Sequence, residues 1–340
     1  MRPMQPVFDG HNDALLRATA EEIAAGRPDG HLDVPRARAG GLTAGIFAVF
    51  TPSPERHDPI ISDGGWEEPL PPPLAPGVAA EHALRTAGRL HRLEQLGAVR
   101  LVRDVADLDS CAADGVLGAV LHLEGAEAIG ADLEALELWC AAGLRSLGLV
   151  WSRPNAFGHG VAGRFPSSPD TGDGLTPAGT RLVERCNELG ILLDASHLNL
   201  AGFRDLAATS RAPLVATHSC AHALAPASRN LTDDQLDAIG GSGGLVGITY
   251  VVAFLRADGR DDPDTPLTAI VAHAAHVAER IGVDHVALGS DFDGATIPAA
   301  LGDAAGLPRL LDALRTEFSA DDVERIAWAN WRRVLDSTWR

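Results

Sequence analysis

The chain has 340 residues, of which 46% are hydrophobic and 22% are charged, so it holds enough apolar material for a large folded core. Acidic residues outnumber basic ones by 46 to 28, which gives a formal net charge of −18 and argues against a nucleic-acid or anionic-membrane partner. The sequence contains no lysine, which excludes Schiff-base chemistry and a carbamylated lysine between two metal ions.

Targeting signals are not visible in the sequence. No stretch reaches the roughly 18 apolar residues that a membrane span needs. The first residues, MRPMQPVFDGHND, contain no apolar signal segment. We therefore expect a cytoplasmic protein.

Short apolar runs alternate with helical patterns along the whole chain. The runs are continuous, as is typical of parallel strands that helices cover on both faces. We predict eight strands, at Pro6–Gly10, Thr43–Phe50, Gly118–Leu123, Leu144–Val150, Ile191–Ala195, Leu214–Thr217, Leu245–Tyr250 and Val286–Gly289. This order predicts one α/β domain, a (β/α)8 TIM-type barrel over residues 1–340. A doubly wound sheet is the structural alternative, but no Gly-x-Gly-x-x-Gly motif follows a strand.

Three of the intervening helices carry clear capping signals. They predict helices from Thr176 to Gly190, from Thr232 to Gly240, and from Ser319 towards the end of the chain. Two segments rich in proline and glycine, at about 51–80 and 151–175, predict long loops. In a barrel both would lie at the carboxyl ends of the strands and would wall a substrate pocket.

Acidic and histidine side chains follow five of the eight predicted strands. These segments are Asp9–Asp13, Glu124, Asp194–His197, Thr217–His218 and Asp291–Asp293. All five lie at the end of the barrel where such folds build active sites. This one-sided distribution indicates a catalytic centre.

The residue types indicate a centre with two divalent metal ions. His11 and Asp13 are two residues apart and share one face of an extended segment, and imidazole with carboxylate suits Zn²⁺ or a similar ion. His197 and His218 can hold a second ion. Glu124 is the available carboxylate to bridge the two ions, whose mutual repulsion a shared anion lowers. Such a pair activates a shared water as a nucleophile.

Two further residues are assigned to the substrate. Amide hydrolysis needs a proton on the departing nitrogen, and Asp291 at the end of the last strand is the candidate acid and base. Arg229 follows the sixth strand on the same face, where its guanidinium can bind a substrate carboxylate.

These motifs resemble those of the membrane (renal) dipeptidase family of zinc metallopeptidases. The segments are FDGHND, LEG at Glu124, GLTPAGTRLVERCNELGILLDASHLN, ATHSCAHAL, SRNLTDDQL and GVDHVALGSDFDG, in the family's order over residues 7–335. The resemblance, to bacterial members, implies an amidohydrolase-like barrel with two Zn²⁺ ions that cleaves dipeptides, including those with a C-terminal D-residue. It also implies a homodimer.

The resemblance carries over residue by residue. It places His11, Asp13, Glu124, His197 and His218 at ligand positions, Arg229 at the substrate-carboxylate anchor and Asp291 at the proton-handling aspartate. The chain departs from the family after the fourth strand, where Trp151 stands in place of a substrate-contacting histidine. We take His159, in the same loop, as a candidate replacement. The aromatic cluster after the seventh strand is reduced to Tyr250 and Phe254, so Trp151, His159 and Tyr250 are candidate substrate contacts.

Two other functions fit the same sequence features. An amidohydrolase-type barrel acting on a non-peptide amide, lactone or phosphoester would use the same ligands. A metal-binding barrel that has lost catalysis is the alternative outside enzymes, and the presence of Asp291 argues against it.

Overall fold

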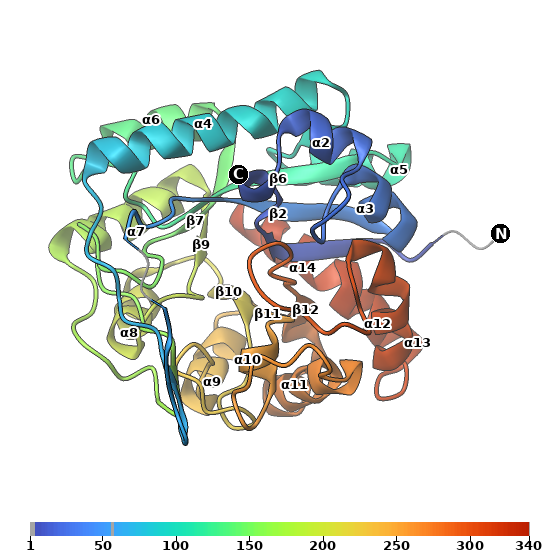
Figure 1. Ribbon diagram of the computed structural model, residues 1–340. Coiled ribbons are helices and arrows are strands. Elements are labelled where there is room, and N and C mark those ends of the chain that lie inside the picture. Colours follow the sequence, from blue (N-terminus) through green and yellow to red (C-terminus); the bar gives the residue numbers. More distant parts are fainter. Residues whose placement is uncertain (1–3, 56–57, 340) are drawn as a thin grey trace.

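The computed structural model of the chain describes residues 4–55 and 58–339. Eight parallel strands form a nearly closed barrel in the order β1-β2-β6-β7-β9-β10-β11-β12, as the sequence predicts (Figure 1). An isolated parallel bridge between Asn12 and Phe292 joins the last strand region to the first. The barrel strands are β1 Val7–Asn12, β2 Leu42–Phe50, β6 Leu117–Glu124, β7 Leu144–Gly148, β9 Leu192–Asp194, β10 Val215–Ser219, β11 Leu245–Ile248 and β12 Val286–Leu288, and β5 Val99–Leu101 pairs with β6.

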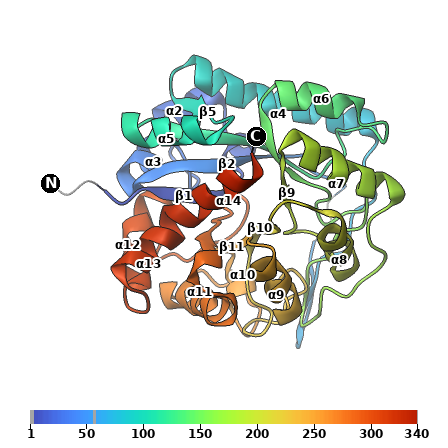
Figure 2. The same ribbon diagram turned by 180° about the vertical axis from the view of Figure 1, so that it is seen from behind.

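Helices surround the barrel on all sides (Figures 1 and 2). They are α1 Ala14–Arg17, α2 Ala20–Ala25, α3 Val34–Gly40, α4 Pro76–Gln95, α5 Val105–Asp114, α6 Glu134–Ala141, α7 Pro177–Leu189, α8 Leu200–Thr209, α9 Asp233–Gly241, α10 Val252–Leu255, α11 Leu267–Ile281, α12 Leu307–Leu314, α13 Ala320–Glu324 and α14 Asn330–Thr338. Short 3₁₀ turns lie at Val283–His285 and Ala304–Gly306, and a π turn at Arg325–Ala329 joins α13 to α14. Within the described residues, no helix is long and apolar enough to cross a membrane.

The predicted caps of three helices are confirmed. The Thr176 side chain accepts from the backbone N–H of Gly179 at the start of α7, and Ser319 accepts from Asp322 at the start of α13. Thr232 forms a capping box with Gln235, but α9 continues to Gly241, one residue beyond the predicted stop.

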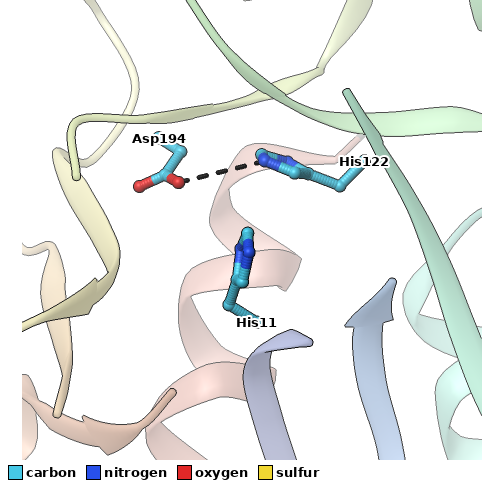
Figure 3. Close-up of side chains that lie close together, drawn as sticks. All are labelled: His11, His122 and Asp194. Carbon is cyan, nitrogen blue, oxygen red and sulfur yellow. Dashed lines mark ion pairs between the residues drawn. The ribbon is translucent and has the colours of Figure 1, made fainter. Parts of the chain in front are cut away.

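The barrel interior changes from apolar to polar along its axis. On β6 every second side chain points inward, so Val120, His122 and Glu124 lie one above the other. Val120 belongs to an apolar cluster at the amino ends of the strands that also contains Phe8 and Ile46. His122 lies in the next layer, beside His11 and Asp194 (Figure 3). Glu124 is the last residue of β6, so the inward-facing side chains change along the strand from apolar Val120 to ionisable Glu124.

The apolar end of the barrel is sealed by the last helix. Figure 2 shows α14 lying across the strands, and its Trp331 is fully buried. The indole packs on Phe8 with ring centroids 5.1 Å apart, and its Nε1 donates to the carbonyl of Leu288 at 2.9 Å. This end is therefore a packed core with no access to ligand.

The segment 51–80 is more ordered than a loop. It contains strands β3 Ile60–Ser62 and β4 Gly65–Glu67, and α4 begins at Pro76. Ser62 pairs with Gly65, so Asp63-Gly64 forms the two-residue turn that hairpins favour. β4 also pairs with β8 Arg164–Phe165, which lies within the predicted loop 151–175. The two segments are thus joined through a small antiparallel sheet.

Candidate active site

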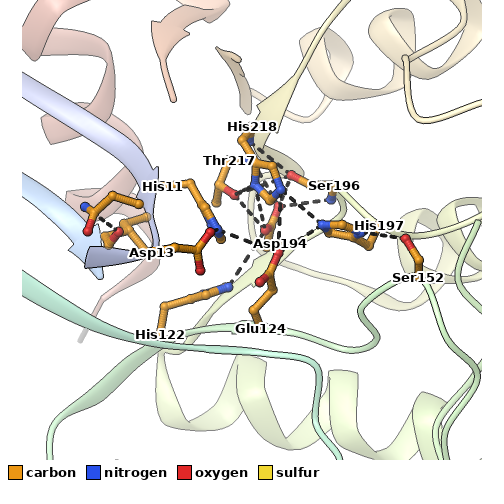
Figure 4. A network of polar contacts seen from close by, with 12 residues as sticks. His11, Asp13, His122, Glu124, Ser152, Asp194, Ser196, His197, Thr217 and His218 are labelled. Carbon is orange, nitrogen blue, oxygen red and sulfur yellow. Dashed lines mark hydrogen bonds and ion pairs between the residues drawn. The ribbon is translucent and has the colours of Figure 1, made fainter. Parts of the chain in front are cut away.

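The structure brings the five predicted ligand side chains together at the carboxyl ends of the strands (Figure 4). His11 lies on β1, with Asp13 directly after it. Glu124 ends β6, His197 follows β9, and His218 lies on β10. All five are buried. The burial of so many ionisable groups in one place requires mutual pairing or a metal ion.

The imidazoles converge on a single carboxylate oxygen. Oε1 of Glu124 lies 2.9 Å from Nε2 of His197, 3.6 Å from Nε2 of His11 and 3.7 Å from Nε2 of His218. The Nε2 atoms of His197 and His218 are 3.1 Å apart, and Nε2 of His11 lies 3.8 Å from Oδ2 of Asp13. Ligand atoms of a tetrahedral zinc ion with bonds of about 2.0–2.1 Å lie about 3.3 Å apart. The observed distances between these ligand atoms, 2.9–3.8 Å, lie on both sides of that value.

Several of these buried atoms have no hydrogen-bond partner in the described part of the chain. They include both ring nitrogens of His11 and Oδ1 of Asp13. Unpartnered buried polar atoms are rare in folded proteins and indicate an ion or a water. Imidazole nitrogen and carboxylate oxygen are also the donors that zinc prefers, so the residues present fit a divalent metal centre.

Burial and neighbouring charges set the protonation of the cluster. Burial, and after it the positive charge of nearby groups, holds the pKa of His197 and of His218 well below its usual range, so both rings are neutral at pH 7. Burial opposes charge on His11 as well, but the carboxylates of Glu124 and Asp13 outweigh it and raise its pKa to about 10. Burial raises the pKa of Glu124 to about 8. A cation among these groups would favour the ionised carboxylates and the neutral imidazoles.

Hydrogen bonds behind two of the imidazoles fix their orientation. Asp194 accepts from the hydroxyl of Thr217 at 2.6 Å, and the Thr217 oxygen lies 2.9 Å from Nδ1 of His218. Because the Thr217 proton points to Asp194, its oxygen accepts the Nδ1 proton of His218, which leaves the lone pair on Nε2, where Arg229 lies 3.3 Å away. The Ser152 hydroxyl lies 3.0 Å from Nδ1 of His197, within hydrogen-bond distance of that ring.

Asp291 lies beside the ligand cluster on a strained turn. Its backbone is in the left-handed region, with φ of +60°, and its N–H donates to the carbonyl of His11 at 3.0 Å. Burial, and after it the Asp13 carboxylate, raises the pKa of Asp291 to about 7, which suits an acid and base at neutral pH. A side chain at Gly294 would collide with the carboxylates of Asp291 and Asp13 and would force them to move.

Arg229 reaches the same cluster from the loop after β10. Its guanidinium is buried and donates to the carbonyl of Ser196. Nη2 lies 3.2 Å from Nε2 of His197 and 3.3 Å from Nε2 of His218. The side chain also lines a cavity of about 1970 Å³ onto which Glu124 and Asp291 open. A carboxylate that enters this cavity finds a positive charge next to the imidazoles.

The three other candidate substrate contacts have different positions relative to the cavity. Trp151 lines the cavity, with its ring 4.9 Å from Phe50 and 5.8 Å from the ring of His197. His159 does not line the cavity, and its ring lies close to Gly172. Tyr250 is 1% exposed, its ring centroid lies 5.7 Å from that of Phe292, and it does not line the cavity. Of the three, only Trp151 therefore lines the cavity.

Arg153 is a positioning residue that the sequence did not reveal. It is fully buried behind Trp151, and its Nε donates to Glu127 at 2.9 Å. Its other nitrogens donate to the carbonyl of Thr51 and the hydroxyl of Ser53. The side chain thus ties together the loops after β2, β6 and β7. The only signal in the sequence is its place next to Trp151, since its partners lie 26 to 102 residues away.

The barrel and its cluster define a metal-dependent hydrolase of the amidohydrolase-like kind. Comparison with known proteins agrees. A model of the membrane dipeptidase family (peptidase family M19) matches residues 2–339. A metallo peptidase from Rhodobacter sphaeroides, whose crystal structure holds a phosphinate mimic of the dipeptide L-Ala-D-Ala, is 47% identical, with a TM-score of 0.94 over 99% of this chain and all of that one.

Two sequence relatives extend the comparison. The dipeptidase ataJ of Aspergillus terreus is 29% identical over 97% of this chain and 84% of its own length. An uncharacterised protein of Klebsiella pneumoniae, in the pqqA 5′ region, is 51% identical over 72% of this chain and 90% of its own length. The chain therefore belongs to the membrane dipeptidase family, and it is a hydrolase of peptide bonds.

Proposed function

We propose that this chain is a binuclear zinc dipeptidase that also accepts dipeptides with a C-terminal D-residue. The observation that carries the proposal is the approach of three imidazole Nε2 atoms, from His11, His197 and His218, to one oxygen of Glu124 within 3.7 Å. Such convergence from four separate strand ends has no use in packing a core and suits a metal centre.

The residues divide into two ligand sets. His11 and Asp13 would hold one ion, His197 and His218 the other, and Glu124 would contribute to both. Two bound divalent ions supply Lewis acidity towards the scissile carbonyl and lower the pKa of water towards neutrality.

Asp291 handles the proton that the departing amine requires. Its pKa of about 7 lets it take a proton and release it at neutral pH, and its strained turn holds the carboxyl beside Asp13. The hydrogen bond from the backbone N–H of Asp291 to the carbonyl of His11 holds Asp291 beside the proposed metal ligands.

Arg229 and Trp151 bind and orient the substrate. The buried guanidinium of Arg229 pairs with the free C-terminal carboxylate, which directs cleavage to the bond before the C-terminal residue. The Trp151 ring, held from behind by Arg153 at 5.4 Å, forms an apolar wall of the cavity. Acceptance of a C-terminal D-residue is supported by the likeness to the Rhodobacter sphaeroides protein, which binds an L-Ala-D-Ala mimic. A cytoplasmic location and a homodimer stay predictions of the sequence.

The variant Arg229→Met tests this function against the hydrolysis of other amides or esters. For a dipeptide, kcat/KM is expected to fall roughly 30- to 1000-fold, because a buried charge pair with the carboxylate is lost. For the same dipeptide with a C-terminal amide, the already low kcat/KM is expected to stay unchanged. Arg280→Met removes a surface arginine that pairs with Asp237 and serves as the matched control.

Two results would contradict the proposal. Equal losses for the dipeptide and its amide would show that Arg229 does not bind the carboxylate. Metal-dependent turnover of lactones or phosphoesters, with none of dipeptides, would assign the barrel to another hydrolase. A paired library of L-Xaa-L-Xaa and L-Xaa-D-Xaa dipeptides then measures the preference at the C-terminal position.

A further inference from the structure

A second group of polar side chains lies one layer deeper in the barrel than Glu124. It consists of His11, His122 and Asp194, whose ligand-type atoms lie within 4.8 Å of one another (Figure 3). His11 and His122 are fully buried and Asp194 is 3% exposed. Below this layer the interior is apolar, so the group forms the polar floor of the site.

Each member of the group has unused hydrogen-bonding capacity. Nδ1 of His122 lies 2.8 Å from the hydroxyl of Ser146, but its Nε2 has no hydrogen-bond partner in the described part of the chain. Oδ1 of Asp194 accepts three hydrogen bonds, whereas among the described residues Oδ2 accepts one, from Thr217. The ring nitrogens of His11 likewise have no hydrogen-bond partner within the described residues. Burial of such atoms without a hydrogen-bond partner destabilises the folded state.

The spacing in this group differs from that of the upper cluster. Nε2 of His122 and Oδ2 of Asp194 are 4.0 Å apart, too far for a direct hydrogen bond. Two zinc ligands at a tetrahedral angle lie about 3.3 Å apart, close to the 2.9–3.7 Å found around Glu124. Two partners of one water molecule, each about 2.8 Å from it, lie about 4.6 Å apart. The 4.0 Å spacing lies between these two values and is wider than each distance from an imidazole to Glu124.

Charge disfavours a metal ion in this position. Asp194 already accepts four hydrogen bonds, and the Glu124 carboxylate beside His11 already faces three imidazoles. An additional divalent ion would lie near the ions proposed above and would be repelled by both, since charges inside a buried site are weakly screened. A neutral molecule that donates and accepts satisfies the same atoms without this cost.

We propose that one ordered water molecule binds between His122, Asp194 and His11, and that His122 positions the His11 ring through it. The water donates one hydrogen bond to Oδ2 of Asp194. Its remaining donor and acceptor positions form hydrogen bonds with Nε2 of His122 and with a ring nitrogen of His11. Partners of this kind behind a metal-binding histidine fix its ring and its tautomer. The inference rests on the proposed role of His11 as a metal ligand.

Two substitutions at His122 separate this role from simple packing. His122→Phe keeps the ring but removes the polar atom, whereas His122→Gln keeps a polar atom near the position of Nε2. Zinc affinity is measured by competition with a chromophoric chelator. His122→Phe is expected to weaken the binding of one of the two ions roughly 10- to 100-fold, and His122→Gln much less. If His122 only fills space, the two variants will bind zinc equally.

A crystal structure of the zinc-loaded wild-type protein decides the identity of the bound species, even if His122→Phe does not fold. The expected result is a density peak within hydrogen-bond distance of all three side chains and without anomalous signal at the zinc edge. An anomalous peak there would show a third ion and overturn the proposal, as would direct contact between His122 and Asp194. A wild-type protein that binds no zinc would refute the proposed function instead, which keeps the two failures distinct.

Discussion

The two ends of the barrel are built from opposite kinds of side chain, although the same strands supply both. At the amino ends, Phe8 and Val120 pack in an apolar cluster that Trp331 of α14 closes. At the carboxyl ends, buried histidines and carboxylates face a cavity. On β6 the change occurs between Val120 and His122, which are consecutive inward-facing residues of the strand.

This difference shows how the molecule separates stability from chemistry. The active end contains features that destabilise a fold, including the left-handed backbone of Asp291 and Asp293 and several desolvated charges. The sealed end offers tightly packed apolar contacts with no polar group left unpaired at Trp331. Substitutions at the active end should therefore lower catalytic activity, and substitutions at the sealed end should lower the free energy of unfolding.

The largest loss of activity is expected for Glu124→Gln, at the active end. The amide cannot serve as an anionic ligand shared by two ions, so kcat/KM for a dipeptide should fall roughly 10³-fold or more and the zinc content should drop. The folded state should persist, because the substitution removes a buried carboxylate whose pKa is raised to about 8. Kinetics, metal analysis and thermal unfolding measure the three effects. Glu134→Gln, at the exposed start of α6, is the control, and wild-type activity of Glu124→Gln would contradict the assignment.

A smaller loss is expected for Asp291→Asn. Removal of the group that transfers the proton should lower kcat roughly 10²- to 10³-fold. Zinc content and KM should stay close to those of the wild type, because the ligands are intact. If the variant instead loses one zinc ion, Asp291 is a ligand rather than the acid and base, as its closeness to His11 and Asp13 would then explain.

The smallest effect on activity is expected at the sealed end, for Trp331→Ala. The substitution leaves a cavity under β1 and removes the hydrogen bond to Leu288, so the free energy of unfolding should fall by roughly 3–5 kcal/mol. The kcat of the folded fraction should not change. Trp328→Ala, at a half-buried position 6.3 Å from Phe8, should cost less. A large drop in kcat with unchanged stability would refute the separation of the two ends.

Much of this architecture follows from the sequence because its causes are local. Continuous apolar runs predict parallel strands, and the residues directly after them must meet at one end of the barrel. For this reason His11, Glu124 and His218 could be grouped before any coordinates were known. The two-residue periodicity likewise places His122 on the same side as Glu124.

The features that the sequence does not reveal depend on distant contacts. Arg153 has its partners on two other loops, so no local pattern marks it. His159 shares a loop with Trp151, yet it lies near Gly172 and does not line the cavity. The hairpin in 51–80 did have a local signal, the Asp63-Gly64 turn between apolar residues, but the surrounding prolines favoured the prediction of a loop.

The most direct test of the central claim is an anomalous diffraction map of the zinc-loaded protein, recorded above and below the zinc absorption edge. The account predicts two peaks per chain, one bound by His11 and Asp13, the other by His197 and His218, with Glu124 in contact with both. A single peak, or two peaks of which neither touches Glu124, would contradict it.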